Sequence, residues 1–257
     1  METLMKLTKL QDKWKAGGNG LNGWCSIPSS VTAEIMAGYD FDSLTIDLQH
    51  GLVDYQTALT MLQAMTASGI TPMARVPWNE PGIIMKLLDG GALGIICPMV
   101  NTAEDAKAFV GAMRYAPDGY RSSGPTRAVL VHGGGYHDAA NDMLVSLAMI
   151  ETVEALSNVD EICETDGLTG VYVGPSDLAV SMGYKPGLDR KEPEVDEAIG
   201  AILAAANKHG KRAGIHCGAP AYLNSAFDRG FSFATIASDL RLIGQAIGQN
   251  IAEIKRS

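Results

Sequence analysis

The stretch Leu93–Val100, with the sequence LGIICPMV, decides the fold because it is an almost unbroken apolar run marked by glycine and proline. A short apolar run without polar alternation is typical of a parallel strand buried on both faces. Apolar residues in the following segment recur at the spacing of one helix face, namely Ala106, Phe109, Val110 and Met113. The stretch therefore predicts a buried strand followed by an amphipathic helix.

Seven further units of this kind follow one another along the chain. Their predicted strands are Leu21–Ile27, Ser43–Leu48, Thr71–Val76, Leu144–Ile150, Gly170–Val173, Lys211–His216 and Phe231–Ile236. Eight units in 257 residues indicate a (β/α)₈ TIM barrel, which typically takes about 250 residues. An open doubly wound sheet is the alternative, but the first strand–helix turn carries no GxGxxG. No shift in composition marks a boundary, so residues 1–257 are expected to form one barrel domain.

The alternation pauses between Pro117 and Asn141, in a segment rich in glycine and proline. Loops of this length are usually functional or mobile. Its Gly-rich part, His132–His137, is interpreted as a mobile loop. It makes a poor phosphate cradle, because no Walker Lys-Ser/Thr follows it.

Composition narrows the class of protein. Apolar residues make up 46% and charged residues 19%, as in an ordinary folded protein. The net charge is −9 and no Lys/Arg cluster occurs, which argues against nucleic-acid binding. No apolar run approaches the ~18 residues needed to span a membrane. Four cysteines without CxxC spacing, and an N-terminus without a signal-peptide core, lead us to expect a reduced, cytoplasmic protein.

Two acidic residues follow predicted strands that are one strand–helix unit apart. Glu151 ends the fifth strand, and Asp177 follows the sixth. Barrels of this type carry their active sites at the C-terminal ends of the strands. Two carboxylates there suit a divalent ion that prefers oxygen ligands, such as Mg²⁺ or Mn²⁺. The alternative is that each residue caps the helix that follows it.

Four more polar residues fall on the same predicted rim. Asp47 and His50 lie three residues apart at a strand end, where a carboxylate could fix the imidazole tautomer and leave a base. The alternative is a helix-capping aspartate and a loop histidine. Arg75 lies in an apolar strand and needs an anion, either Glu151 or a substrate carboxylate or enolate. His216 is expected to line the pocket, whereas its neighbour Cys217 points to the opposite face.

A set of motifs in this order resembles the HpcH/HpaI aldolase family over most of the chain. The segments are Pro72–Pro81, Lys86–Asp89, Pro98–Val100, Arg114-Tyr115, Gly119–Arg121, Met149–Thr152 and Gly174–Leu178. The resemblance implies a class II, metal-dependent pyruvate aldolase. It also implies a barrel whose additional C-terminal helix is exchanged between the subunits of a hexamer, a trimer of dimers.

The resemblance assigns roles to the rim residues. It implies that Glu151 and Asp177 hold Mg²⁺, Mn²⁺ or Co²⁺, and that pyruvate chelates this ion. The family's arginine falls on Arg75, and its Asp–His dyad on Asp47 and His50.

Backbone amides around Gly174, Pro175 and Ser176 are expected to bind the pyruvate carboxylate. Met149 stands where several members of the family carry glutamine, so their dicarboxylic substrate cannot be transferred directly. The aldehyde pocket is expected to involve the segment Pro117–Asn141 and the residues after His50, with a neighbouring subunit as a further contributor.

The implied reaction is reversible cleavage of a 4-hydroxy-2-oxoacid to pyruvate, or a close 2-oxoacid, and an aldehyde. The base is either His50 held by Asp47 or a metal-bound water. No lysine lies at a predicted catalytic strand end, which disfavours a Schiff-base aldolase. The alternatives are a citrate-lyase-β-like acyl-CoA lyase, for which the rim has few basic residues, and a non-catalytic oxoacid-binding barrel.

Overall fold

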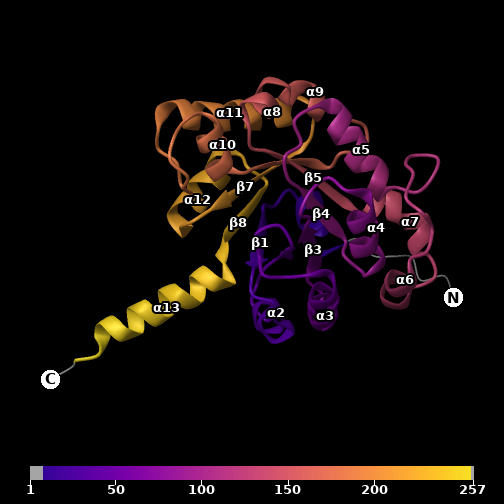
Figure 1. The fold of residues 1–257 in the computed structure, drawn as a ribbon, viewed down its shortest axis with the longest axis horizontal. Helices are drawn as coiled ribbons and strands as arrows, with labels where there is room; N and C mark the ends of the chain where they lie inside the picture. Colours follow the sequence, from indigo (N-terminus) through magenta and orange to yellow (C-terminus); the bar gives the residue numbers. More distant parts are fainter. Residues whose placement is uncertain (1–7, 256–257) are drawn as a thin grey trace.

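The computed structural model describes residues 8–255 and shows eight parallel strands closed into a barrel (Figure 1). The strands are β1 Gly20–Cys25, β2 Ser43–Asp47, β3 Thr71–Arg75, β4 Gly94–Cys97, β5 Val145–Ile150, β6 Gly170–Val173, β7 Arg212–Cys217 and β8 Phe233–Ser238. Each strand pairs with the next along the chain, and β8 pairs with β1. The predicted barrel is confirmed, and every predicted strand overlaps an observed one.

Helices follow the strands and surround the barrel. They are α1 Lys9–Lys15, α2 Ser30–Ala37, α3 Tyr55–Met65, the 3₁₀ helix η1 Thr66–Ser68, α4 Pro81–Asp89, α5 Ala103–Met113, α6 Thr126–His132, α7 Tyr136–Met143, α8 Val153–Ser157, α9 Val159–Cys163, α10 Pro175–Ser181, α11 Pro193–Lys208, α12 Pro220–Arg229 and α13 Asp239–Glu253. Side-chain caps fix several starts: Ser29, Asp54 and Thr102 each accept a hydrogen bond from an N–H of the first turn. Within residues 8–255, no helix combines the length and apolar character that crossing a membrane requires.

The inside of the barrel is a packed core rather than a channel. Successive strand residues point to opposite faces, and Met73, Ile96, Leu147, Tyr172 and Phe233 belong to one buried cluster from five different strands. Residues two positions further along a strand point to the same inner face, but they lie nearer to the C-terminal end of that strand. Polar residues at these positions therefore face the mouth of the barrel.

The helix α1, which the sequence did not predict, lies at the N-terminal end of the barrel. Its Leu10 is fully buried, and the Leu10 N–H donates to Thr71 Oγ1 at 3.0 Å. Its Trp14 packs edge-on against Phe233 and donates from Nε1 to the carbonyl of Ser232 at 2.7 Å. Because α1 covers this end, ligands have to enter from the C-terminal ends of the strands.

The segment Pro117–Asn141 contains helices, which corrects the expectation of an irregular loop. It forms α6 and the start of α7, and the glycines form only the turn between them. Buried Arg121 joins the segment to α4 by donating to Asp89 Oδ1 at 2.6 Å and to the Tyr136 hydroxyl at 3.1 Å. Glycine and proline here mark helix boundaries rather than a disordered loop.

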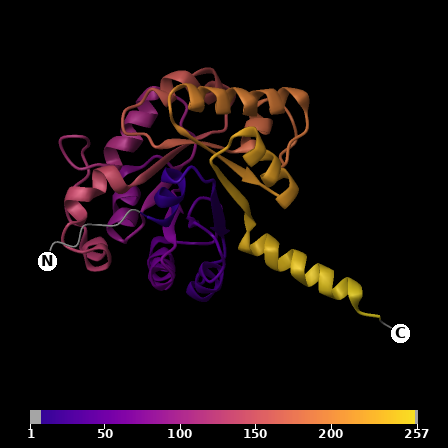
Figure 2. The same ribbon diagram turned by 180° about the vertical axis from the view of Figure 1, so that it is seen from behind.

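The last helix, α13, projects away from the barrel as one extended rod (Figures 1 and 2). Apolar residues recur every three or four positions along α13 and at the residue that caps its C-terminal end, and each is between 45% and 60% exposed: Leu240, Ile243, Ile247, Ile251 and Ile254. A continuous apolar stripe in water is unfavourable for an isolated chain. The predicted additional C-terminal helix is therefore present, and its apolar face is uncovered.

Candidate active site

The C-terminal ends of β2 and β3 hold a buried ion pair. The register of the two strands places Asp47 beside Arg75, and the guanidinium donates to the carboxylate from Nε at 2.9 Å and from Nη2 at 2.6 Å. Such a two-point pair is strong and fixes the plane of the guanidinium. The sequence left Glu151 or a substrate as the partner of Arg75, and the structure shows Asp47 instead.

Trp24, at the end of β1, completes this corner of the site. Its Nε1 donates to Asp47 Oδ2 at 3.2 Å, and its ring lies 4.8 Å from the Arg75 guanidinium carbon. Burial raises the pKa of the Asp47 carboxyl, but hydrogen bonds and charge from Arg75, with the bonds from Trp24 and the His50 backbone, lower it below its ordinary value. Asp47 therefore stays ionised. Nη1 of Arg75 has no hydrogen-bond partner among the described residues.

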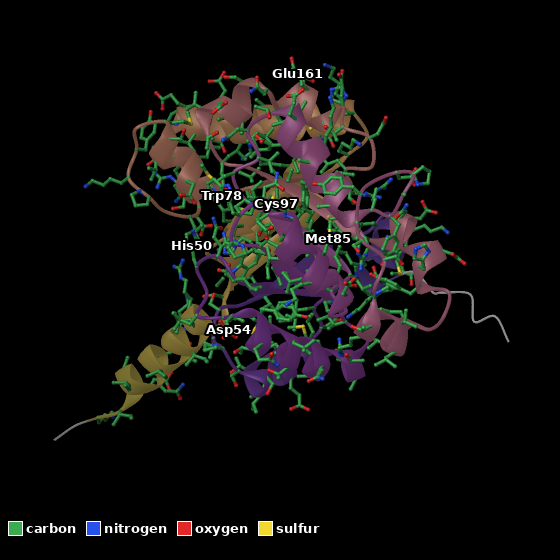
Figure 3. The ribbon with its side chains drawn as sticks, turned by 45° about the vertical axis from the view of Figure 1, so that its right-hand side comes forward. His50, Asp54, Trp78, Met85, Cys97 and Glu161 are labelled. Atoms are coloured by element: carbon green, nitrogen blue, oxygen red, sulfur yellow. The ribbon has the colours of Figure 1, made fainter. Side chains whose placement is uncertain are left out.

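His50 differs from the expected carboxylate–imidazole dyad. The backbone N–H groups of Gln49 and His50 donate to Asp47 Oδ1 at 3.0 and 3.3 Å, but within residues 8–255 no hydrogen bond joins the His50 ring to Asp47. The ring is exposed at the rim, and Figure 3 shows it projecting outward. Asp47 thus holds the backbone turn that carries His50, because its oxygens already accept from Arg75 and Trp24.

Glu151 follows β5 and is 2% exposed. Its Oε1 accepts a hydrogen bond from the Met99 N–H at 2.8 Å, and Met99 adopts a positive φ of 53° to present that group. Burial raises the pKa of Glu151 to about 7; the Met99 N–H opposes this, the nearby negative charge of Asp177 adds to it, and the Arg75 charge opposes it. A positive φ is strained for a residue other than glycine, and strained backbone conformations of this kind cluster at functional sites.

The alternative to a metal site was that Glu151 and Asp177 each cap the helix that follows. Neither of them does. Thr152 caps α8, with its hydroxyl accepting from the Ala155 N–H at 2.9 Å. The residue preceding α10 is Gly174, and Asp177 lies exposed in the first turn of that helix without a hydrogen bond to any described residue. Both carboxylates are therefore available to a ligand.

The space beside Glu151 fits a small cation. A Cβ placed on Gly174 would lie 2.4 Å from Glu151 Oε2, so only glycine leaves this oxygen uncovered. Two adjacent carboxylates that repel each other favour a cation, and hard divalent ions accept oxygen ligands. No cluster of three or more His, Cys, Asp or Glu side chains suited to a metal occurs in the described part of the chain. Glu151 and Asp177 are therefore two candidate ligands rather than a complete set of protein ligands.

A pocket of about 350 Å³ opens at this end of the barrel. Six of the predicted site residues line it, namely His50, Arg75, Gly174, Pro175, Ser176 and Asp177. Asp47 and Glu151 are buried behind its wall. A larger groove of about 640 Å³ between α5 and α9 is lined by acidic residues at half of its positions and contains none of the predicted residues.

The rest of the wall contains residues to which the sequence gave little or no role. Trp24, Leu188, Ser238 and Arg241 line the pocket, together with His216. Leu188 comes from the loop after α10, which is tied back where Ser176 Oγ accepts from the Gly187 N–H at 3.2 Å. The segment Pro117–Asn141 was expected to help form the pocket. This expectation is wrong for the part of the wall that this chain forms, because that wall contains no residue of the segment.

Comparisons with known proteins identify the family of the chain. The profile of the HpcH/HpaI aldolase/citrate lyase family matches residues 24–246. A hydroxypyruvate/pyruvate aldolase of Rhizorhabdus wittichii is 43% identical over 97% of this chain and 99% of the relative. A 4-hydroxy-2-oxo-heptane-1,7-dioate aldolase of Salmonella dublin is 36% identical, covering 91% and 90%. A solved HpcH/HpaI family protein from Burkholderia cenocepacia superposes with a TM-score of 0.89 at 29% identity, covering 96% and 98%.

Proposed function

The chain belongs to the HpcH/HpaI aldolase/citrate lyase family and is an aldolase, and we propose that it reversibly cleaves 4-hydroxy-2-oxoacids to pyruvate, or a close 2-oxoacid, and an aldehyde. The observation that carries the proposal is the pair Glu151 and Asp177, free of capping roles, in the same site as the Arg75 guanidinium. The relatives, which are named as aldolases, favour this reaction over an acyl-CoA lyase or a non-catalytic barrel.

Glu151 and Asp177 are proposed to hold a divalent ion, Mg²⁺, Mn²⁺ or Co²⁺, as is typical of the family. When bound, such an ion supplies Lewis-acid stabilisation of negative charge on the 2-oxoacid. The Met99 N–H holds one Glu151 oxygen and leaves the other beside Gly174. We also propose that the segment Gly174, Pro175 and Ser176, which lines the pocket, positions the carboxylate of the 2-oxoacid.

Arg75 is proposed to stabilise the charge that develops on the keto oxygen when the C3–C4 bond breaks. Asp47 holds two of its nitrogens, so the guanidinium is oriented before substrate binds, and Nη1 remains available. Donors fixed in advance around a developing oxyanion are among the largest contributions to catalysis.

His50 is proposed to take the proton from the C4 hydroxyl. His50 is one of the residues that line the pocket, and within residues 8–255 its exposed ring is not hydrogen-bonded to Asp47. The turn that carries it is held by the two backbone hydrogen bonds to Asp47 Oδ1. A rim histidine that is held by its backbone can reach a substrate hydroxyl and then exchange its proton with solvent.

The assembly and the setting of the protein are further proposals. The uncovered stripe on α13, with the exposed apolar residues Val31 and Ile35 on α2, supports exchange of α13 between subunits of a hexamer. Four cysteines that are all buried as free thiols support a reducing, cytoplasmic setting.

Release of pyruvate tests the proposed reaction. A 4-hydroxy-2-oxoacid is incubated with the protein and divalent metal, and pyruvate is measured by coupling to lactate dehydrogenase. We expect release that depends on protein concentration, and addition of an aldehyde in excess should drive the reverse reaction. Absence of pyruvate release across a panel of such acids would contradict the proposal.

A further inference from the structure

His216 occupies a position in the pocket that the proposed chemistry does not use. It lies on β7 and faces into the barrel, with its ring edge-on to Trp24 at 4.8 Å between centroids. The pKa of its imidazole is lowered to about 3, chiefly by burial; the positive charges of Arg75 and Arg241 contribute to the lowering, and the negative charge of Asp47 opposes it. An imidazole whose conjugate acid is this strong is a poor base at neutral pH. His216 therefore acts as a neutral hydrogen-bonding group.

A buried chain of hydrogen bonds sets its tautomer. His216 Nδ1 lies 3.1 Å from the hydroxyl of Tyr172, and that hydroxyl donates to Thr235 Oγ1 at 2.7 Å. Asn22 Nδ2 also donates to Thr235 Oγ1, at 2.9 Å, and its Oδ1 accepts from two hydroxyls of β2. Because the Tyr172 proton points to Thr235, the proton between Tyr172 and His216 belongs to Nδ1.

Nε2 of His216 is consequently left with a lone pair. Within residues 8–255 it has no hydrogen-bond partner, and it is not among the buried polar atoms left unsatisfied, so the pocket reaches it. This lone pair can accept a hydrogen bond, so the matching group on a substrate has to be a hydrogen-bond donor. Aldehyde, alkyl and carboxylate groups carry no donor, whereas a hydroxyl group does.

The position of His216 relative to the acids indicates which part of the substrate it meets. Glu151 follows β5 and Asp177 follows β6, on the side proposed for the 2-oxoacid. His216, Ser238 and Arg241 line the pocket from β7, from the end of β8 and from the start of α13. Together with His50, these three polar side chains belong to the part of the wall that the 2-oxoacid is not proposed to occupy.

We propose that His216 Nε2 accepts a hydrogen bond from a hydroxyl group that the aldehyde itself carries, separate from the C4 hydroxyl that forms from its carbonyl oxygen, and that it selects hydroxyaldehydes over alkyl aldehydes of equal size. This inference rests on the proposed aldolase function. Tyr172 is a positioning residue, since it fixes the tautomer without reaching the substrate.

The test compares addition of pyruvate to glycolaldehyde and to propanal, which match in size and differ in one hydroxyl group. The readout is the ratio of kcat/KM for the two aldehydes. We expect wild type to favour glycolaldehyde, and His216→Leu to lower the ratio about tenfold, the effect of one hydrogen bond. His216→Gln should restore part of the ratio, because its amide oxygen also accepts.

Tyr172→Phe keeps the ring and removes the partner of Nδ1, so it should lower the ratio in the same direction. This variant keeps the test decisive if His216→Leu fails to fold. A ratio unchanged from wild type in Tyr172→Phe, together with an unchanged ratio in the folded His216 variants, would overturn the inference.

Two further measurements separate the possible failures. Deuterium exchange at the methyl group of pyruvate reports the 2-oxoacid half alone; if wild type shows neither exchange nor addition, the proposed function itself fails. The second measurement repeats the addition to both aldehydes with hydroxypyruvate in place of pyruvate. If the His216 variants lower rates with hydroxypyruvate whichever aldehyde is used, the hydroxyl lies on the wrong half and the inference is overturned.

Discussion

Arg75 and Asp47 show how much of a site depends on strand register. The sequence indicated that a guanidinium in an apolar strand needs an anion, but it offered Glu151 or a substrate. The observed partner follows from the pairing of β2 with β3, which sets the two residues side by side. Register results from packing across the whole barrel, so neither strand alone reveals it.

Arg75→Ala should lower kcat about 100- to 1000-fold, as loss of one oxyanion donor does. The reason is that the interaction strengthens as charge develops in the transition state. Steady-state kinetics would show it, with circular dichroism to correct for the folded fraction, because Asp47 is left buried without its partner. A rise in KM alone would reduce Arg75 to an anchor for the substrate.

Asp47 should contribute stability that depends on pH. Its pKa in the folded state lies below its ordinary value, so this contribution is present above the unfolded pKa of about 4 and is lost as pH falls through the folded pKa. Denaturant unfolding of wild type and Asp47→Asn measures it. The difference in free energy of unfolding should shrink as pH is lowered below about 4; a difference that stays constant would contradict this.

The two acids were predictable from the sequence, whereas much of the remaining pocket wall was not. Glu151 and Asp177 could be placed because a carboxylate after a buried strand is unusual and parallel strands end at one rim. Trp24 and Arg241 look like ordinary core and helix residues in the sequence. Only closure of β8 onto β1 brings them to the same pocket.

At the scale of elements, the helices α6 and α7 were missed because glycine and proline obscured short periodic stretches. Their anchor is Arg121, which is buried against Tyr115 at 4.5 Å and bonded to Asp89 and Tyr136. Hydrogen bonds between segments far apart in sequence, rather than local propensity, hold these helices in place.

Arg121→Ala should destabilise the protein by about 3 kcal/mol, since it leaves partly buried Asp89 without its partner. Urea unfolding measures the change. Lys107→Ala on α5, whose side chain is exposed, is the control and should stay within about 0.5 kcal/mol of wild type. Equal stability of the two variants would show that the anchor is unimportant.

The helix α13 should mediate assembly through its apolar stripe. Ile247→Asp places a charge at the centre of the stripe and should dissociate the oligomer, because an unpaired charge is costly in an apolar interface. Gln249→Asp, an exposed position on the other side of the same helix, should leave it intact. Size-exclusion chromatography with light scattering measures the mass of each.

A monomeric wild-type protein, or an Ile247→Asp variant with the wild-type mass, would refute the assembly. The exchange was expected only from the resemblance. The sequence pattern by itself shows an amphipathic helix and cannot say whether its apolar face covers its own barrel or that of a partner.

For the whole molecule, the order of elements was predictable because each strand is a short apolar run and each is followed by a helix. A closed parallel barrel then concentrates function at one end, and α1 blocks the other end. The net charge of −9 would repel an anionic oxoacid at long range. Arg75, Arg241 and a bound cation would reverse that sign within the pocket.

The central claim is that Glu151 and Asp177 hold the ion on which cleavage depends. The most direct measurement is pyruvate release by protein stripped with EDTA, before and after Mn²⁺ is titrated back, in wild type and in Glu151→Gln. The account predicts no release from the stripped protein, recovery in wild type, and no comparable recovery in Glu151→Gln at the same Mn²⁺ concentration. Full activity of the metal-free protein, or equal recovery in Glu151→Gln, would contradict it.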